Sequence, residues 1–328
     1  MRHLKNIKLL LNYVVGPLLI PLLGYSIYQK LFSKPFSGQA FLDLYHGLNG
    51  TSILQLLLLL LFMMLNWGLE AWKWKISMAL YKPVSYSEAF KGVLAGTSFG
   101  FFTPNRVGEY VGRVVVLQPG NRATSLSLTL VCSIAQLLVT LFAGLAGLFF
   151  LNRSRLFLSS GFQLTGHILL YASLTAIVFL LLSYVSMRKW SGWLNEKSWF
   201  SRLSPYAKAL ESLQTKMLFQ VLFLSILRYI VFIIQYGLAF SIFKISLSPE
   251  QLFGSVSVVF LVVALVPSLA QLFELGVRWE ASMEIVGLFT PNLAAVFSAS
   301  FTIWVVNLVF PALVGMFFLW KIRVFKNT

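Results

Sequence analysis

The sequence predicts an all-α, polytopic membrane protein with about six full spans, two broken helical segments and an inverted repeat. Two observations about composition favour this class. Hydrophobic residues make up 58% of the 328 residues. Charged residues make up only 11%, whereas soluble domains average about 25%. This composition excludes a soluble enzyme, a disordered tail and a disulfide-stapled secreted scaffold. A third observation, the order of the apolar segments, predicts the arrangement within the class.

Six apolar runs are long enough to span a bilayer, which takes roughly 20 residues. The first run is too long for a signal-peptide core, so we expect it to be retained. Two further apolar segments are interrupted by Pro, Gly and charged residues. Such backbone is tolerated at membrane depth only where protein or a water-filled cavity surrounds it. The expected spans are 9–32, 51–72, 126–151, 164–187, 217–243 and 293–320, and the broken segments are 85–120 and 248–291.

Basic residues predict the orientation. The net charge of +16 is assigned to cytoplasmic loops facing anionic lipid, not to a nucleic-acid surface. Most Lys and Arg residues fall at the two termini, after the second span and after the fourth span. A multi-pass protein of the inner (cell) membrane with both termini in the cytoplasm is therefore predicted, whether the broken segments re-enter or form pairs of short spans. The stretch after the second span contributes Lys73, Lys75, Lys82 and Lys91.

The two broken segments begin alike. Ser85 with Glu88, and Ser248 with Gln251, fit capping boxes. Each segment then meets a proline, Pro104 or Pro267, nineteen residues after its serine. The charge pattern places the two serines on opposite sides of the membrane.

The order of apolar segments also repeats, with each broken segment between the second and third spans of its half. We therefore predict one transmembrane domain, 1–328, built from halves 9–151 and 164–320 in opposite orientations. Transporters of this kind bind their substrate at the repeat interface.

Charged residues at membrane depth are the first candidates for a site, because they are costly there. Arg106, Glu109 and Arg113 follow Pro104 at helical spacing and can share one face. Their excess of positive charge, beside a helix N-terminus, suits a phosphate or carboxylate. The structural alternative is an Arg–Glu–Arg network that holds the segment together.

The second half offers a matching set. Glu280 and Glu284 are four residues apart and need a cation or a proton between them. Arg278, or Arg228 in the fifth span, could supply the charge, although Arg228 could instead extend toward the membrane surface. Shared protons would allow proton coupling. Glu274 completes the candidate set.

Glycine and proline residues interrupt both broken segments. Gly92, Gly96 and Gly100 are spaced by four and allow a neighbouring helix to approach closely. Thr103 or Asn105 is expected to cap the helix that follows the break. Breaks of this kind also predict hinges for alternating access, and the candidate hinge residues are Gly100, Pro104, Gly108, Pro267 and Gly276.

Other chemistry is not supported by the residues. Cys132 is the single cysteine, and His3, His46 and His167 are far apart in the sequence. No phosphate-binding Gly-rich loop and no nucleophile–base pair occurs in a recognisable context. We therefore predict no metal and no cofactor, and favour a protein that is not an enzyme.

The motifs Pro-x-Arg-x-Gly-Glu-x-x-x-Arg at Pro104–Arg113 and Glu-Leu-Gly-Val-Arg at Glu274–Arg278 resemble those of the lysylphosphatidylglycerol synthase transmembrane-region family. The resemblance covers roughly residues 10–325. It implies a flippase-like integral membrane protein without the aminoacyltransferase domain of bifunctional members. The second motif departs from the usual Gly-Gly-x-Gly-x-x-Glu, because Phe273 and Glu274 replace glycines.

These observations predict a flippase-like transporter or scramblase for an anionic lipid or lipid-linked carrier. In this hypothesis the arginines hold the phosphate, and carboxylates orient them. The alternatives are a membrane-embedded transferase or accessory subunit in glycolipid or aminoacyl-lipid synthesis, and a transporter of small solutes or ions. The expected partner is an anionic membrane lipid; nothing in the sequence indicates nucleic acid or an oligomeric state.

Overall fold

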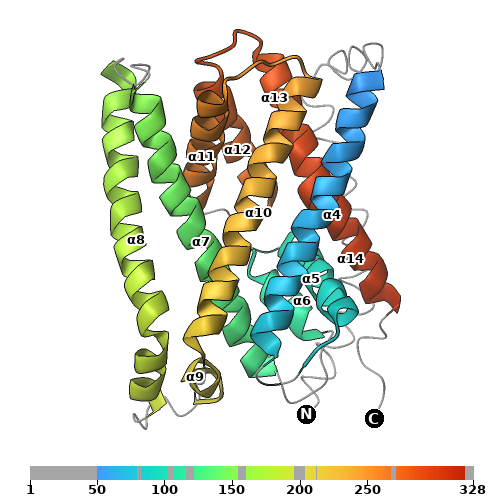
Figure 1. Cartoon of the computed structure of the whole chain (residues 1–328), viewed down its shortest axis with the longest axis vertical. Coiled ribbons are helices and arrows are strands. Elements are labelled where there is room, and N and C mark those ends of the chain that lie inside the picture. The colour runs from blue at the N-terminus through green and yellow to red at the C-terminus, as the bar shows by residue number, and fades with distance from the viewer. Residues whose placement is uncertain are drawn as a thin grey trace.

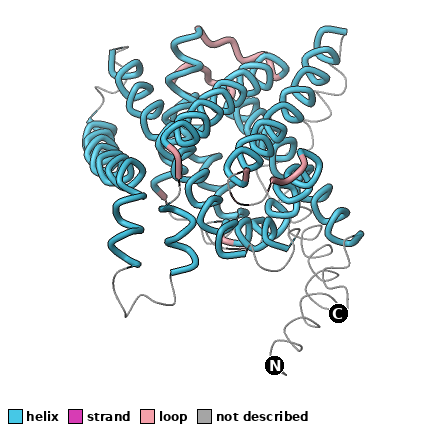
Figure 2. Tube along the Cα trace, turned by 60° about the horizontal axis from the view of Figure 1, so that its bottom comes forward, coloured by secondary structure: helices cyan, strands magenta, loops and turns pink. Residues whose placement is uncertain are grey.

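The computed structural model is all-α across the residues that it describes (Figures 1 and 2). These residues are 50–79, 81, 83–101, 103, 106–115, 122–153, 160–195, 204–211, 213–266 and 271–321. No strand occurs within these ranges, which confirms the predicted fold class. The expected first span, 9–32, lies outside the described residues.

Five segments are long and apolar enough to cross a membrane, and they confirm the last five predicted spans. Four of them are single helices. The fifth, Leu293–Leu319, is composite. A short helix, α9 (Ser204–Glu211), follows the fourth predicted span. The spanning helices are α4 (Gly50–Met78), α7 (Arg122–Arg153), α8 (Ser160–Asn195), α10 (Thr215–Ile242) and the series α13 (Leu293–Trp304), η5 (Val305–Val309) and α14 (Phe310–Lys321).

The composite span contains a π-helical turn with a local cause. Pro311 has no N–H to donate to the carbonyl of Asn307, four residues earlier, so regular α-helical bonding fails there. The N–H of Phe310 instead donates to the carbonyl of Val305, five residues earlier. A π-turn inside a long helix frequently marks a functional position, and this one places Asn307 midway along the span.

Both broken segments are helix pairs, as predicted: α5 (Tyr86–Phe101) with α6 (Gly108–Val115), and α11 (Pro249–Leu265) with α12 (Gln271–Val286). The first capping box is formed, because the Ser85 N–H donates to Glu88 Oε2 at 2.9 Å and the Glu88 N–H to Ser85 Oγ at 3.2 Å. Ser248 and Gln251 form the second. Pro104, Asn105 and Pro267 lie outside the described residues.

The helices of the first pair lie antiparallel in very close contact. A Cβ added to Gly112 would lie 2.5 Å from the Ala95 carbonyl oxygen, and one added to Gly96 would lie 2.8 Å from the Glu109 carbonyl oxygen. The glycine stripe therefore does what its spacing predicts and lets two backbones touch. The Gly108 N–H donates to Thr103 Oγ1 at 2.6 Å, so Thr103 caps α6.

The two hairpins lie in opposite halves of the bundle, with α5 and α6 in the lower part of Figure 1 and α11 and α12 in the upper part. Each hairpin packs against the last span of the other half of the chain, α5 against α14 and α11 against α7, while α4 packs against α10. The largest buried core includes Leu59, Trp74 and Phe240 from α4 and α10. This reciprocal packing fits the predicted inverted repeat, which itself stays a prediction.

Candidate functional site

A buried carboxylate in α4 joins three cations from three helices. Glu70 is 4% exposed. Its Oε2 lies 2.7 Å from Lys73 Nζ and 2.8 Å from Arg228 Nη1, and its Oε1 lies 2.7 Å from Arg113 Nη2. The sequence folds this way locally because Glu70 and Lys73 are one turn apart on α4. The other two partners come from α6 and α10.

The charges in this network do not balance. Lys73, Arg113 and Arg228 contribute three formal positive charges against the one formal negative charge of Glu70. Glu109 lies 3.9 Å from Arg113 and also pairs with Arg106. Counting Glu109 and Arg106 adds one negative and one positive charge, so the excess of two positive charges is unchanged. Buried charge without a counter-charge is costly. The region is therefore electrostatically suited to an anion.

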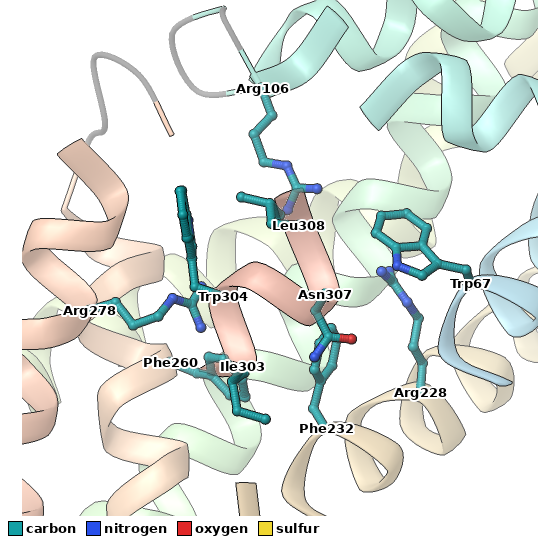
Figure 3. Close-up of a pocket in the computed structure, with 10 residues that line it drawn as sticks. All are labelled: Trp67, Arg106, Arg228, Phe232, Phe260, Arg278, Ile303, Trp304, Asn307 and Leu308. Carbon is teal, nitrogen blue, oxygen red and sulfur yellow. The ribbon is translucent and has the colours of Figure 1, made fainter. Parts of the chain in front are cut away.

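A pocket beside the network opens between the two hairpins and the spans α4, α10 and α13–η5. Its cavity volume is about 60 Å³, where about 10–15 Å³ accommodates one water molecule. Three guanidinium groups point toward its centre from different sides, as Figure 3 shows. The lining residues are Trp67, Arg106, Arg228, Phe232, Phe260, Arg278, Ile303, Trp304, Asn307 and Leu308.

Arg228 and Arg278 are held in place by hydrogen bonds and aromatic rings. Arg228 Nε donates to Asn66 Oδ1 at 2.5 Å, and its guanidinium lies 5.4 Å from the centre of the Trp67 ring. Arg278 donates to Glu274 Oε1 at 2.6 Å and to the Tyr236 hydroxyl at 3.1 Å. Fixed guanidinium groups lose little freedom when they bind an oxyanion, which favours tight binding.

Arg106 completes the trio from the tip of the first hairpin. It pairs with Glu109, and its side chain is 35% exposed. Its φ of 59° lies in the left-handed region, where a non-glycine residue is strained. The N–H of Arg106 donates to the Thr103 carbonyl at 3.2 Å, which helps to hold this conformation. Strain of this kind is concentrated at functional sites.

Several buried polar atoms around the pocket have no hydrogen-bond partner within the described part of the chain. They include the indole N–H groups of Trp67 and Trp304 and both amide atoms of Asn307. All three residues are at most 6% exposed. Unpaired buried polar atoms are rare in proteins and indicate a missing partner. A bound anion would accept hydrogen bonds from the indole groups and from the Asn307 amide N–H.

The structure brings together six of the eight predicted binding residues. Arg106, Glu109, Arg113, Arg228, Glu274 and Arg278 lie in or directly beside this constellation.

Glu280 and Glu284 do not join it, since both are exposed on α12. The prediction that Arg278 or Arg228 lies between them is wrong, because Arg278 pairs with Glu274 and Arg228 pairs with Glu70. Extension of Arg228 to the membrane surface is also wrong. Arg228 sits midway along α10 and is 9% exposed.

Lys73 requires a second correction. The sequence placed it in a cytoplasmic segment, but α4 continues to Met78 and Lys73 is 1% exposed. Sequence reasoning also missed Glu70, Asn66 and Asn307. For Glu70 a signal was available, because Glu70 and Lys73 are one helical turn apart at the end of an apolar run. Nothing in the sequence pattern marks the other two.

The candidate hinges fall into two groups. A Cβ added to Gly100 would lie 2.6 Å from Glu109 Cγ, and one added to Gly108 would lie 2.2 Å from the Phe99 carbonyl oxygen. These two glycines are therefore required for packing. Gly276 has no atom within 4 Å of an added Cβ and stays a candidate hinge.

Comparison with known families gives one match. The family model described as Lysylphosphatidylglycerol synthase TM region matches residues 18–315. The comparisons with curated proteins and with solved structures gave no match. The matched range includes the Glu70 network, both hairpins and every residue that lines the pocket.

Proposed function

Because the chain belongs to the lysylphosphatidylglycerol synthase transmembrane-region family, we propose that it is a flippase-like transporter or scramblase for an anionic lipid or lipid-linked carrier. The observation that carries this proposal is the buried excess of two positive charges beside a pocket lined by three arginines. Membrane anions with phosphate headgroups are the ligands that such a site suits best.

The pocket's size limits what enters it. A cavity of about 60 Å³ accommodates a phosphate headgroup but not acyl chains. In the proposed mechanism the headgroup binds among Arg106, Arg228 and Arg278 while the chains stay in the bilayer. The aromatic lining keeps bulk water from competing for the guanidinium groups.

Movement would come from the two hairpins. Arg106 and Arg278 belong to hairpins in opposite halves of the bundle (Figure 1). In the proposed cycle, opening one hairpin exposes the pocket to one leaflet and opening the other exposes it to the opposite leaflet. The inverted repeat, an inner-membrane location and cytoplasmic termini are parts of this proposal. A soluble phosphate ester is the second candidate substrate, because the cavity fits a headgroup-sized anion whether or not acyl chains are attached.

The first test is mass spectrometry of lipids retained by the detergent-purified protein. Wild type is expected to enrich one anionic lipid class over the host membrane. Arg278→Gln should reduce that enrichment at least about tenfold, because removing one partner of a buried charged contact costs about 2–5 kcal/mol. Arg188→Gln is the matched control, because Arg188 is an exposed arginine on α8, a helix that contributes no residue to the pocket lining.

The second test measures lipid movement in proteoliposomes with a fluorescent anionic lipid and a membrane-impermeant quencher. Wild type should move the label between leaflets, and Arg106→Gln/Arg278→Gln should not, while Arg188→Gln behaves as wild type. Normal movement by a correctly folded double variant would overturn the proposal. Product formation from lipid and a sugar or aminoacyl donor would favour a transferase instead.

A further inference from the structure

Lys73 is buried in the bundle but has few hydrogen-bond partners. Its side chain is 1% exposed. An ammonium group has three hydrogens to donate. Within the described ranges Lys73 Nζ has two acceptors, Glu70 Oε2 at 2.7 Å and Ser225 Oγ at 3.5 Å, and the second distance is at the outer limit of a hydrogen bond. The position therefore suits a neutral amine at least as well as an ammonium group.

Lys73 is also the cation of the Glu70 network that can give up its proton. The guanidinium groups of Arg113 and Arg228 keep their protons in proteins, whereas a buried lysine can exist as the neutral amine. With Lys73 neutral, the formal excess of the network falls from two positive charges to one. Because uncompensated buried charge is costly, the smaller excess is the less costly state of an empty pocket.

Ionisable groups from four helices surround Lys73 in the described part of the chain. Three of them are charged: Glu70 on α4, Arg113 on α6 and Arg228 on α10. The fourth is Cys132 on α7, whose Sγ lies 3.2 Å from Ser77 Oγ, one turn from Lys73. Its thiol could also exchange a proton, and replacing it by serine separates the two. Helix α5 packs against α4 too, but its Glu88 and Lys91 are exposed.

Lys73 and the pocket are connected by one oxygen atom. Glu70 Oε2 lies 2.7 Å from Lys73 Nζ and 2.8 Å from Arg228 Nη1, and Arg228 lines the pocket (Figure 3). An anion that binds to Arg228 brings negative charge close to Lys73, which favours the ammonium form at low dielectric. By linkage, a proton on Lys73 raises the affinity for the anion by the same factor.

A polar face of α7 leads from the end of the bundle to Lys73. Helix α7 begins and α4 ends in the lower part of Figure 1, at the end that is predicted to face the cytoplasm. Ser125, Thr129 and Cys132 are spaced by four and three residues, so they share one helix face, and each is at most 1% exposed. This face ends beside Ser77, so a proton has hydrogen-bonding groups along its way to the buried amine.

We propose that Lys73 is a proton-binding site that takes up a proton when the pocket binds its anion and releases it when the anion leaves. The proton comes from water: an O–H bond of the donor breaks, and an N–H bond forms at Nζ. This inference rests on the proposed function and adds a coupling ion to it. An anion that moves together with a proton can be driven by a pH gradient across the membrane.

The experiment counts the protons taken up for each bound anion. Purified protein in neutral detergent is titrated calorimetrically with phosphatidylglycerol, whose phosphodiester keeps its charge at mildly acidic and mildly alkaline pH. Two buffers of different ionisation enthalpy are used. For wild type the binding enthalpy should differ between the buffers and give an uptake of up to about one proton per lipid. Affinity should be about tenfold higher at the mildly acidic pH, within the usual range for coupled sites.

Two variants fix the charge in opposite states. Lys73→Arg keeps the positive charge and Lys73→Met removes it, so both should abolish proton uptake and the pH dependence. Lys73→Arg should bind about tenfold more tightly than Lys73→Met. Cys132→Ser should behave as wild type. So should Lys75→Met, the matched control, because Lys75 is an exposed lysine of the same helix.

Several results would overturn the proton site. Equal binding enthalpies in the two buffers and equal affinities at the two pH values would do so with wild type alone. Proton uptake that persists in Lys73→Met, or that is lost in Cys132→Ser, would do so as well. A purely structural role of Lys73 would lower the stability of its variants without changing the proton count.

Proteoliposomes test the coupling to movement. An imposed pH gradient should concentrate a labelled anionic lipid in the leaflet on the alkaline side with wild type, and should not do so with Lys73→Met. An even distribution in wild type would overturn the coupling.

Failure of the proposed function has a different signature. In that case phosphatidylglycerol does not bind wild type at either pH, or it binds Arg278→Gln equally well. Lipid binding that requires Arg278 but takes up no proton overturns the proton site alone. Dimethyl phosphate, a soluble phosphodiester of the same charge, distinguishes the source of the anion. Proton uptake with dimethyl phosphate and not with the lipid would support the proton site and assign the anion to the aqueous phase.

Discussion

The two hairpins share an architecture but are held together in different ways. The first packs backbone against backbone through glycines, and its Arg113 reaches a carboxylate on a separate helix, Glu70. The second packs side chain against ring, with the Arg278 guanidinium 5.2 Å from the centre of the Phe260 ring. Arg278 also finds its carboxylate, Glu274, on its own helix.

This difference separates two roles for a buried arginine. In the first hairpin the charges connect α6 to α4 and α10, so the hairpin is linked electrostatically to the rest of the bundle. In the second hairpin the ion pair is local and balanced, and it orients one arginine toward the pocket. The first hairpin should therefore be the more rigid and the second the more mobile.

Replacing the carboxylate partner of each hairpin's arginine is the strongest test of this contrast. Glu70→Gln removes the counter-charge of Lys73 and Arg228 and leaves Arg113 with Glu109 alone, at 3.9 Å, and we expect a loss of about 3–5 kcal/mol in stability. Glu274→Gln leaves Arg278 with the Tyr236 hydroxyl and should cost about 1–3 kcal/mol. Thermal unfolding in detergent measures both.

A double variant checks the mechanism of that loss. Adding Arg113→Gln to Glu70→Gln removes one of the unbalanced cations, so it should recover part of the lost stability. Equal losses of stability in Glu70→Gln and Glu274→Gln would show that the Glu70 network contributes no more to stability than the local pair of Glu274 and Arg278.

The next comparison replaces one glycine in each hairpin by alanine. Gly112→Ala would place a Cβ 2.5 Å from the Ala95 carbonyl oxygen and from Gly96 Cα, and such overpacking costs about 1–3 kcal/mol or more. Gly276→Ala meets no atom within 4 Å and should gain up to about 1 kcal/mol from helix propensity.

The same pair sharpens the question of mobility. If Gly276 is a hinge, Gly276→Ala should slow lipid movement in proteoliposomes while leaving thermal stability unchanged or raised. Wild-type rates in this variant would remove Gly276 from the hinge set.

The smallest effect concerns the carboxylates that the fold leaves exposed. Glu280→Gln and Glu284→Gln should each change stability by no more than about 0.5 kcal/mol. Neither should change lipid retention, because Arg278 pairs with Glu274 and Arg228 pairs with Glu70. A loss of retained lipid as large as that of Arg278→Gln would return these residues to the site.

Local patterns predicted local structure well. Both capping boxes, the cap at Thr103, the glycine stripe and the pairing of Arg106 with Glu109 depend on residues within a few positions of one another. The spans followed from composition, since burial of backbone groups in lipid allows little but helices. The predicted arginine between Glu280 and Glu284 was wrong, because helical spacing cannot say which face of α12 meets the bundle.

The residues alone predicted an all-helical membrane protein with two interrupted segments, and they identified most of the arginines at membrane depth. The partners of these arginines became known from the three-dimensional packing. Glu70 and Arg113 are forty-three residues apart, and Glu70 and Arg228 are 158 apart, so no periodicity links them. Asn307 became a candidate only when the packing of both halves enclosed its amide beside the arginines. Which charges remain unbalanced depends on contacts between distant segments, and that balance is what makes the pocket suited to an anion.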